Sequence, residues 1–330
     1  MKCEAGKPVT CCRLLAAAAL LLVQATAASA AESYPTRPVR IVVPSGAGGI
    51  TDILARVIAQ GLGDSLGQQV IVDNRPGASG IVGSQIVAKA TPDGYTLLMV
   101  FPSHPVNPSL VVKMPYDTVK AFAPITMVSA VALVLIVNAA LPAKTVQELI
   151  AMAKERPGQL NYGTVGRGSL GHLGAELFRA MTGATIMHVS YKGTPQILAA
   201  LLSGEINIYF IASMGSALPH IKSGRMTALG VSTRQRLPNL PEVPPIADAV
   251  PGYEVRGWNG ILAPAGTPRA VIDRLHREAV RIVRSPGFAE QIAIEGAVPV
   301  GNTPEQFGAI IRADIEKWAK VIKEAGIRAE

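Results

Sequence analysis

Cysteine is nearly absent from the sequence. Of 330 residues only three are cysteines, and all of them, Cys3, Cys11 and Cys12, lie within the first twelve positions. The chain that follows can therefore form no disulfide, no thiolate metal site and no cysteine nucleophile. Its fold has to be stabilised by ordinary core packing, and about 300 residues are enough to bury such a core.

Clustered charge and aromatic residues are also scarce. The formal net charge is +8, but no run of five basic residues occurs, and aromatic residues make up 5% of the chain. A nucleic-acid-binding surface would show a stripe of basic side chains with interleaved aromatics, so we expect no nucleic-acid partner. A positive overall field weakly favours small anions, although the basicity is equally compatible with a neutral trait of the surface.

Enzyme signatures are missing as well. The sequence contains neither a G-x-S-x-G nor an H-E-x-x-H motif, and its five histidines are dispersed. We therefore expect no metal, no cofactor and no enzymatic activity. One enzymatic alternative stays open, an exported hydrolase in which His172 or His104 serves as base for Ser169 or Ser103. A fold can assemble such a pair from distant positions.

The N-terminus has the pattern of a secretory signal peptide. Basic residues, among them Lys2, Lys7 and Arg13, precede an apolar stretch at 14–23, and the triplet Ala28-Ser29-Ala30 follows. This order predicts residues 1–30 as a signal peptide cleaved near Ala30, and hence a periplasmic protein. The alternative is an uncleaved membrane anchor, which the short apolar stretch disfavours.

The remaining chain alternates between strand-like and helix-like segments. Residues 39–43, 69–72 and 96–100 are predicted strands, and residues 51–66 and 80–90 between them are predicted helices. This β-α-β-α-β order predicts a parallel sheet covered by helices on both faces.

A second α/β set follows, and the chain then returns to helices. Capping boxes, T-V-Q-E and T-P-E-Q, mark two of the helix starts. The predicted strands are 132–138, 161–164, 185–189, 206–211, 226–232 and 256–263, and the predicted helices are 145–155, 170–181, 195–202, 216–223, 268–284, 286–295 and the segment from 304 onward.

Two long apolar runs, at 124–138 and 256–263, bracket the second set. If both cross between the sets, the C-terminal helices return to the first. We therefore predict two α/β lobes joined by a hinge of two strands, with a cleft suited to ligand closure. The first lobe is expected to comprise residues 34–128 and 255–330, and the second residues 129–254.

The stretch PSGAGGITD, residues 44–52, lies between a predicted strand and a predicted helix. A dinucleotide fingerprint would need glycine where Thr51 stands, and a P-loop would need a lysine that is absent. What remains is a glycine-rich turn at a helix start, where free N–H groups favour anions. Thr51 or Asp52 could cap this helix, and the alternative interpretation is a tight turn without a ligand.

The second lobe repeats this arrangement in NYGTVGRGSLGHLGAEL, residues 161–177. Glycines at 166, 168 and 171 again lie between a predicted strand and a predicted helix. Ligands of open α/β sheets bind at the carboxyl ends of strands, so the two loops could face each other across the cleft. Ser103 and His104 end another strand, and Lys192 follows one.

Several segments resemble the Bug family of periplasmic solute receptors, which serve tripartite tricarboxylate transporters. The resemblance runs from about residue 34 to 327. Its motifs include YPTRPVRIVVPSGAGGITD, LNYGTVGRGSLGHLGAELF, HVSYKGTPQILAALLSGEI and GWNGILAPAGTP. It implies a two-lobed Venus flytrap in which backbone N–H groups and bridging waters, rather than an arginine clamp, hold a small carboxylate.

The resemblance also implies a set of ligand-binding positions from both lobes. The family usually carries an aromatic residue at the position of Ser45 and often an acidic one near Ala212, so selectivity cannot be copied from a relative. Arg167 either adds a positive charge to the cleft or faces solvent. The expected positions are Ser45, Gly46, Ala47, Gly48, Gly49, Thr51, Asp52, Ser103, His104, Thr164, Gly166, Arg167, Gly168, Ser169, His172, Tyr191, Lys192, Ala212 and Ser213.

The expected function is capture of a small organic anion and its delivery to membrane permease subunits. A sensor that presents the same ligand switch to a signalling partner is the alternative that the sequence cannot separate from transport. We expect the receptor to be a monomer.

Overall fold

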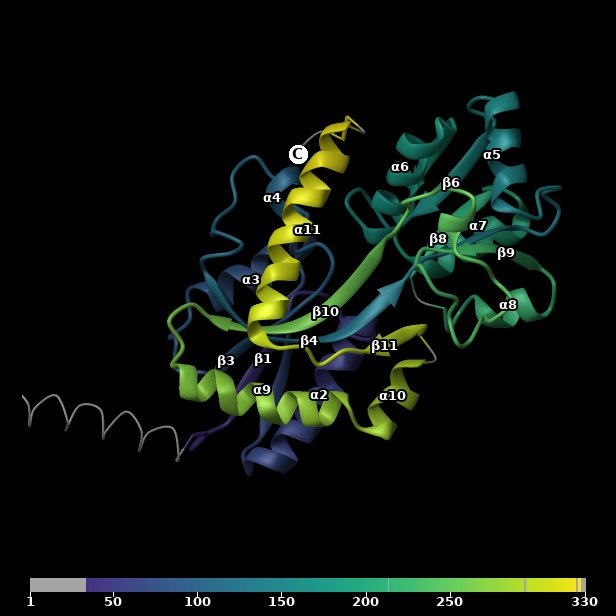
Figure 1. The fold of residues 1–330 in the computed structure, drawn as a ribbon. Helices are drawn as coiled ribbons and strands as arrows, with labels where there is room; N and C mark the ends of the chain where they lie inside the picture. Colours follow the sequence, from purple (N-terminus) through teal and green to yellow (C-terminus); the bar gives the residue numbers. More distant parts are fainter. Residues whose placement is uncertain (1–33, 213, 294, 325, 328–330) are drawn as a thin grey trace, which may run out of the picture.

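The computed structural model describes residues 34–327 apart from 213, 294 and 325, and these form two lobes, each built on one β-sheet (Figure 1). The expected two-lobed α/β architecture is therefore confirmed. The predicted signal peptide lies outside the described residues. Within the described part, no helix combines the length and apolarity needed to cross a membrane.

The first lobe contains a six-stranded mixed sheet. β1 lies between β2 and β3 and runs parallel to both, β10 pairs antiparallel with β3 and β4, and β11 pairs antiparallel with β4. From one edge to the other the strands are β11 (Ala297–Pro299), β4 (Phe122–Ala132), β10 (Arg256–Pro264), β3 (Thr96–Val100), β1 (Val39–Val43) and β2 (Val70–Asn74).

Amphipathic helices cover both faces of this sheet. In α2, Leu54, Ile58, Leu62 and Leu66 recur every four residues and are buried. Each fully buried side chain of this kind stabilises the fold by roughly 1.5–3 kcal/mol. Gly67, at φ 69°, ends α2 in a left-handed conformation. The helical segments of the lobe are α2 (Ile50–Leu66), η1 (Ala78–Gly80), α3 (Ile81–Ala88), α4 (Asn107–Leu110), α9 (Arg269–Val283), α10 (Pro286–Ala293) and α11 (Pro304–Glu324).

The second lobe contains a five-stranded sheet. β6 runs parallel to β7 and β8, whereas β5 is antiparallel to β8 and β9. The strands in order are β7 (Ile186–Ser190), β6 (Leu160–Thr164), β8 (Ile208–Ile211), β5 (Val134–Asn138) and β9 (Met226–Val231), and the helical segments are α5 (Val146–Glu155), α6 (Leu170–Thr182), α7 (Thr194–Ser203), α8 (Leu218–Lys222) and η2 (Ile246–Asp248).

Strand direction places the loops of the two lobes face to face. β4 runs toward the second lobe and continues into β5, which leads away from the first. By their pairing, β1, β2 and β3 share the direction of β4, whereas β6, β7, β8 and β9 run against β5. The carboxyl ends of seven strands therefore point at the opposite lobe, which is the side where open α/β sheets bind ligands.

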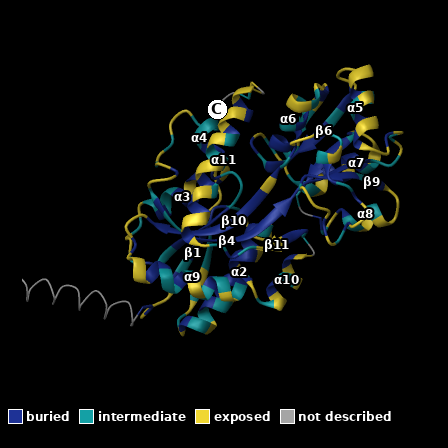
Figure 2. Ribbon diagram, in the orientation of Figure 1, coloured by how far each residue is buried: buried dark blue, intermediate teal, exposed yellow. Residues whose placement is uncertain are grey.

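The lobes are joined by β4 and β10, which pair along their length (Figure 1). Both strands are largely buried (Figure 2). At the crossing, Ser232 Oγ accepts a hydrogen bond from Leu133 N (2.8 Å) and donates one to the carbonyl of Val255. The C-terminal half of α11 adds a third connection, because Trp318 and Ile322 belong to the hydrophobic cluster of the second lobe.

Most predicted elements are present, and the differences have local causes. The strand predicted at 132–138 is found as β5, and the apolar run before it forms a strand of its own, β4, which begins at Phe122. Pro268 precedes α9 rather than opening it. Both capping boxes form, with Thr145 Oγ1 accepting from Glu148 N and Thr303 Oγ1 from Gln306 N. The short elements β11 and α4 were not predicted from the sequence. The predicted residue limits of the lobes stay a prediction.

Candidate functional site

The first glycine loop, residues 45–51, leads from β1 into α2 and is held by Asp52, the third residue of that helix. One carboxylate oxygen of Asp52 accepts hydrogen bonds from Gly48 N (2.9 Å) and Arg56 Nε (3.0 Å). The other accepts from Asn74 Nδ2 (3.0 Å). Burial alone would raise the pKa of Asp52, but the hydrogen bonds outweigh it and lower the pKa. The carboxylate therefore stays charged and shapes the loop.

The start of α2 leaves several N–H groups available. Gly49 is the N-cap residue and no side chain caps the helix, while the first N–H groups of any helix have no partner inside it. Residues 46–49 are exposed, and Thr51 Oγ1 fixes the helix start to β10 through Asn259 Oδ1 (2.9 Å). Ser45 Oγ is buried and has no hydrogen-bond partner among the described residues. The loop thus offers backbone donors on a rigid base.

The second glycine loop, residues 164–171, leads from β6 into α6 and is held by His172. Ser169 caps α6 by accepting from His172 N (3.3 Å), and His172 Nδ1 accepts from Gly168 N (3.2 Å). His172 is 4% exposed. Burial, followed by the neighbouring His188, lowers the pKa of His172 to about 4. The ring is therefore neutral at neutral pH, and its Nδ1 is an acceptor.

A second histidine supports the same loop from β7. The register of the parallel strands places His188 opposite Tyr162, and His188 Nε2 lies 2.6 Å from Thr164 Oγ1. Thr164 Oγ1 in turn accepts from Gly166 N (3.1 Å). Burial lowers the pKa of His188 as well.

The two loops share one design. In each, the side chain of the third helical residue reaches back four positions and accepts an N–H from the loop, Asp52 from Gly48 and His172 from Gly168. In each helix, the N–H groups that precede this residue in the first turn have no hydrogen-bond acceptor within the helix. An anion between the lobes would meet two helix N-termini and their partial positive charge. The fixed carboxylate of Asp52 offsets part of that charge in the first lobe only.

The other expected positions are spread more widely. His104 is buried against Phe122 with a ring separation of 5.4 Å, so it does not face solvent. Tyr191 OH donates to Glu205 (2.8 Å) instead of facing the first lobe, and Lys192 is exposed. Ser213 lies outside the described residues. Ser103 and Ala212 are partly exposed at the carboxyl ends of β3 and β8, and direct ligand contact by any of these residues stays a prediction.

One pocket between the lobes contains a predicted ligand residue. It has a volume of about 280 Å³ and brings Arg167 of the second glycine loop against Ser79, Asn107 and Leu110 of the first lobe. The contact is close, since a Cβ on Gly168 would lie 2.3 Å from Leu110 Cδ1. The second glycine loop therefore contacts the first lobe at this point.

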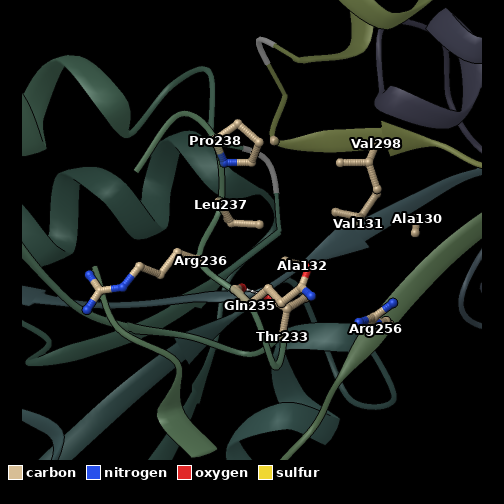
Figure 3. Close-up of a pocket in the computed structure, with 11 residues that line it drawn as sticks. Ala130, Val131, Ala132, Thr233, Gln235, Arg236, Leu237, Pro238, Arg256 and Val298 are labelled. Carbon is tan, nitrogen blue, oxygen red and sulfur yellow. Dashed lines mark hydrogen bonds between the residues drawn. The ribbon is translucent and has the colours of Figure 1, made fainter. Parts of the chain in front are cut away.

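A second pocket lies at the hinge, between Ala130–Ala132 and the segment that begins at Thr233 (Figure 3). Its volume is about 230 Å³. Figure 3 shows Arg236 and Arg256 extending to opposite sides, so the centre is lined mainly by apolar groups such as Leu237. None of the expected ligand-binding residues lines it.

The hydrolase alternative finds no support in the geometry. Among the described residues, no hydrogen bond joins a ring nitrogen of His104 to Ser103 or Ser169. Ser169 Oγ accepts from the backbone of His172, whose Nδ1 is engaged by Gly168. Neither proposed pair has the hydrogen bond between nucleophile and base that such chemistry needs.

Residues 54–327 match the model of the receptor of the tripartite tricarboxylate transporter family. The chain belongs to this family. It is 38% identical to protein BugT of Bordetella pertussis over 321 residues, which is 96% of this chain and 98% of BugT. The periplasmic binding protein BugD has a structure with a TM-score of 0.77 at 32% identity, covering 90% of this chain and 100% of BugD. The resemblance to Bug receptors is therefore confirmed.

Two solved relatives of the family carry a carboxylate. The structure of R. palustris Rpa4515 with adipate has a TM-score of 0.80 at 37% identity and covers 90% of this chain and all of that one. MatC from Rhodopseudomonas palustris with bound malate has a TM-score of 0.75 at 28% identity, with 88% and 100% covered. The chain is thus a member of a family of periplasmic solute-binding receptors, and known members bind carboxylates.

Proposed function

We propose that this protein captures a small organic carboxylate between its lobes and delivers it to the membrane permease of a tripartite tricarboxylate transporter. The observation that carries the proposal is the pair of glycine loops, each opening a helix toward the other lobe with unused N–H groups. Backbone donors at helix starts bind anions without a cationic side chain. The carboxylates bound to two relatives, adipate and malate, support the same ligand class.

Closure of the lobes would follow from this arrangement. A carboxylate docked on the first glycine loop gains further hydrogen bonds only when the second loop approaches. The closed state therefore binds more tightly, which is the condition for ligand-driven closure. The lobes would move about β4 and β10, which connect them.

The ligand class can be tested by calorimetry on the chain from Ala31. Acids from acetate to citrate should be compared with uncharged amides of matched shape, such as succinate with succinamide. We expect heat for at least one acid and none for its amide. Binding of an amide but of no acid would contradict the carboxylate assignment.

The role of backbone donors can be tested at Gly49. Gly49→Pro removes the N–H group, and its φ of −81° is close to what proline requires. Gly49→Ala adds a Cβ but keeps the N–H, and that Cβ would make only ordinary contacts. A hydrogen bond to a charged group contributes about 1.5–3 kcal/mol, so we expect the proline variant to bind about tenfold to a hundredfold more weakly. Equal affinity of the two variants would show that this amide does not hold the ligand.

Delivery requires a transporter partner. We expect the ligand-bound receptor to co-purify with permease subunits in a pull-down from membranes. Recovery of a sensor kinase in place of permease subunits would indicate a sensory role for the same site.

A further inference from the structure

A separate pocket lies beside the second glycine loop, between α6, the edge strand β7 and residues Gly326 and Ile327, which follow α11. Its volume is about 320 Å³. The lining contains five polar side chains that carry charge or titrate, namely Arg167, His172, Glu176, Arg179 and His188.

The negative charge in this pocket is already neutralised. Glu176 is 2% exposed, accepts from Tyr162 OH (2.5 Å), and its two oxygens accept from Arg179 Nη1 at 2.7 and 2.8 Å. Arg179 Nε is buried and has no partner among the described residues. Arg167 makes no ion pair with any described residue. Among the described residues of the lining, two arginines and one carboxylate leave one net positive charge.

The histidines present donors to the pocket. Because His172 Nδ1 accepts from Gly168 N, the proton of that neutral ring lies on Nε2. The Thr164 hydroxyl lies 2.6 Å from His188 Nε2 and 3.3 Å from the Gly166 carbonyl. We assign the hydroxyl proton to the shorter of the two contacts, which places the proton of a neutral His188 ring on Nδ1. Each ring therefore has one nitrogen fixed as an acceptor within the loop and the other as an N–H donor.

We propose that this pocket binds a small tetrahedral oxyanion of the phosphate or sulfate class, held by Arg167, Arg179 and the ring N–H groups of His172 and His188. Among the described residues that line the pocket, the free side-chain groups are donors, and the one carboxylate, that of Glu176, is occupied. A donor set of guanidinium and imidazole N–H groups matches oxyanion acceptors and offers nothing to a cation. The net positive charge favours the same ligand.

The same rings connect the pocket to the second glycine loop. His172 holds Gly168 N–H directly, and His188 holds Gly166 N–H through Thr164. An oxyanion that reorients one of these rings therefore disturbs one N–H group of that loop, and reorienting both rings disturbs two. If the proposed carboxylate function is correct, a bound oxyanion changes carboxylate affinity, a consequence that rests on that function. Oxyanion binding itself does not rest on it.

The first test is nuclear magnetic resonance of the histidine rings in the mature, ligand-free protein. We expect the Nε2–H tautomer for His172 and the Nδ1–H tautomer for His188. Sodium sulfate and sodium phosphate should shift both rings in a saturable way, whereas sodium chloride at equal ionic strength should not. Absence of a saturable shift up to about 50 mM, far above the millimolar range of weak specific binding, would overturn the proposal.

Substitutions of single arginines test whether the oxyanion binds in this pocket. Arg167→Gln removes an exposed cation from the pocket and should weaken sulfate binding at least tenfold. Arg156→Gln removes an exposed cation elsewhere in the same lobe and should leave it unchanged. Arg179→Lys keeps a charge beside Glu176 but removes the guanidinium N–H groups that Glu176 does not use, and it should also weaken binding. If the Arg167 and Arg156 variants weaken sulfate binding equally, sulfate is held only by nonspecific charge attraction, and the proposal is overturned.

A competition experiment between sulfate and a carboxylate distinguishes binding in this pocket from binding between the lobes. If a carboxylate binds, sulfate should still bind to the carboxylate-saturated protein with a changed affinity. Complete mutual exclusion would place sulfate in the cleft and overturn the proposal. If no carboxylate binds at all, the proposed receptor function fails, while the sulfate titration remains a valid test of this pocket.

Discussion

Replacing Asp52 with asparagine should loosen the first glycine loop while keeping the shape of the side chain. The carboxylate accepts from Gly48 N and Arg56 Nε on one oxygen and from Asn74 Nδ2 on the other. An asparagine has only one oxygen. In either orientation its NH₂ group faces at least one of these donors, so at least one hydrogen bond is lost and two donors are placed together.

The magnitude follows from the burial of the group. The Asp52 side chain is 3% exposed, so solvent cannot replace the lost acceptor. A hydrogen bond to a charged group contributes about 1.5–3 kcal/mol. A negative charge in the first turn of a helix adds about 0.3–1 kcal/mol. The ion pair with Arg56 adds little, because that arginine is largely exposed. We therefore expect a loss of about 3 kcal/mol, which lowers the Tm by about 6 °C in a chain of this size.

The test compares the thermal unfolding of the Asp52→Asn variant with that of a control variant, Asp64→Asn. Asp64 lies on the same helix and is exposed, so its replacement should change the Tm by less than about 1 °C. The pKa of Asp52 is lowered by folding, so its contribution is complete above its ordinary value and is lost only in stronger acid. The difference in Tm between the Asp52→Asn variant and the unaltered protein should therefore be the same from pH 5 to pH 8. Equal melting of the two variants would refute the assignment of Asp52 as the anchor of the loop.

Two further predictions concern the second glycine loop and the buried histidine. Gly168→Ala should weaken ligand binding about tenfold or more and destabilise the protein, because the added Cβ would lie 2.3 Å from a leucine side chain of α4. Gly158→Ala, with a similar positive φ and open surroundings, is the control that isolates the steric effect in calorimetry and melting. Burial lowers the pKa of His104 to about 4, so the unfolded chain binds more protons below pH 6.5 and stability falls by about 2 kcal/mol between pH 7 and pH 5. His104→Leu should remove that part of the pH dependence in urea unfolding, and an unchanged slope would contradict a buried neutral imidazole.

Much of the fold could be predicted from sequence because local signals agree with it. The strands 39–43 and 96–100 are found with their predicted limits. In both, the apolar run is followed within two residues by a proline, Pro44 or Pro102, which favours the end of a strand. The two capping boxes form as expected. The apolar run at 124–138 was predicted, but not its division into β5 and the longer strand β4. Its neighbours β10 and β11 lie more than 120 residues later, so no local pattern reveals the pairing.

The candidate site was predicted less completely. The glycine loops were visible, and the four-residue spacing of Asp52 to Gly48 and of His172 to Gly168 could have indicated their anchors. Asn74, Asn259 and His188 were missed as loop supports, because sheet register rather than sequence spacing brings them there. His104 was expected at the cleft because it follows β3, but the turn after that strand directs its ring into the core.

The position of β4 also determines when the first lobe can be completed. Both neighbours of β4 are contributed by chain that follows the whole second lobe. A chain long enough to contain every strand of the second lobe still leaves β4 with two open edges. Contacts of such large sequence separation form late and slowly. The first-lobe sheet, and with it the support of the first glycine loop by Asn259, can therefore be finished only once the last quarter of the chain has appeared.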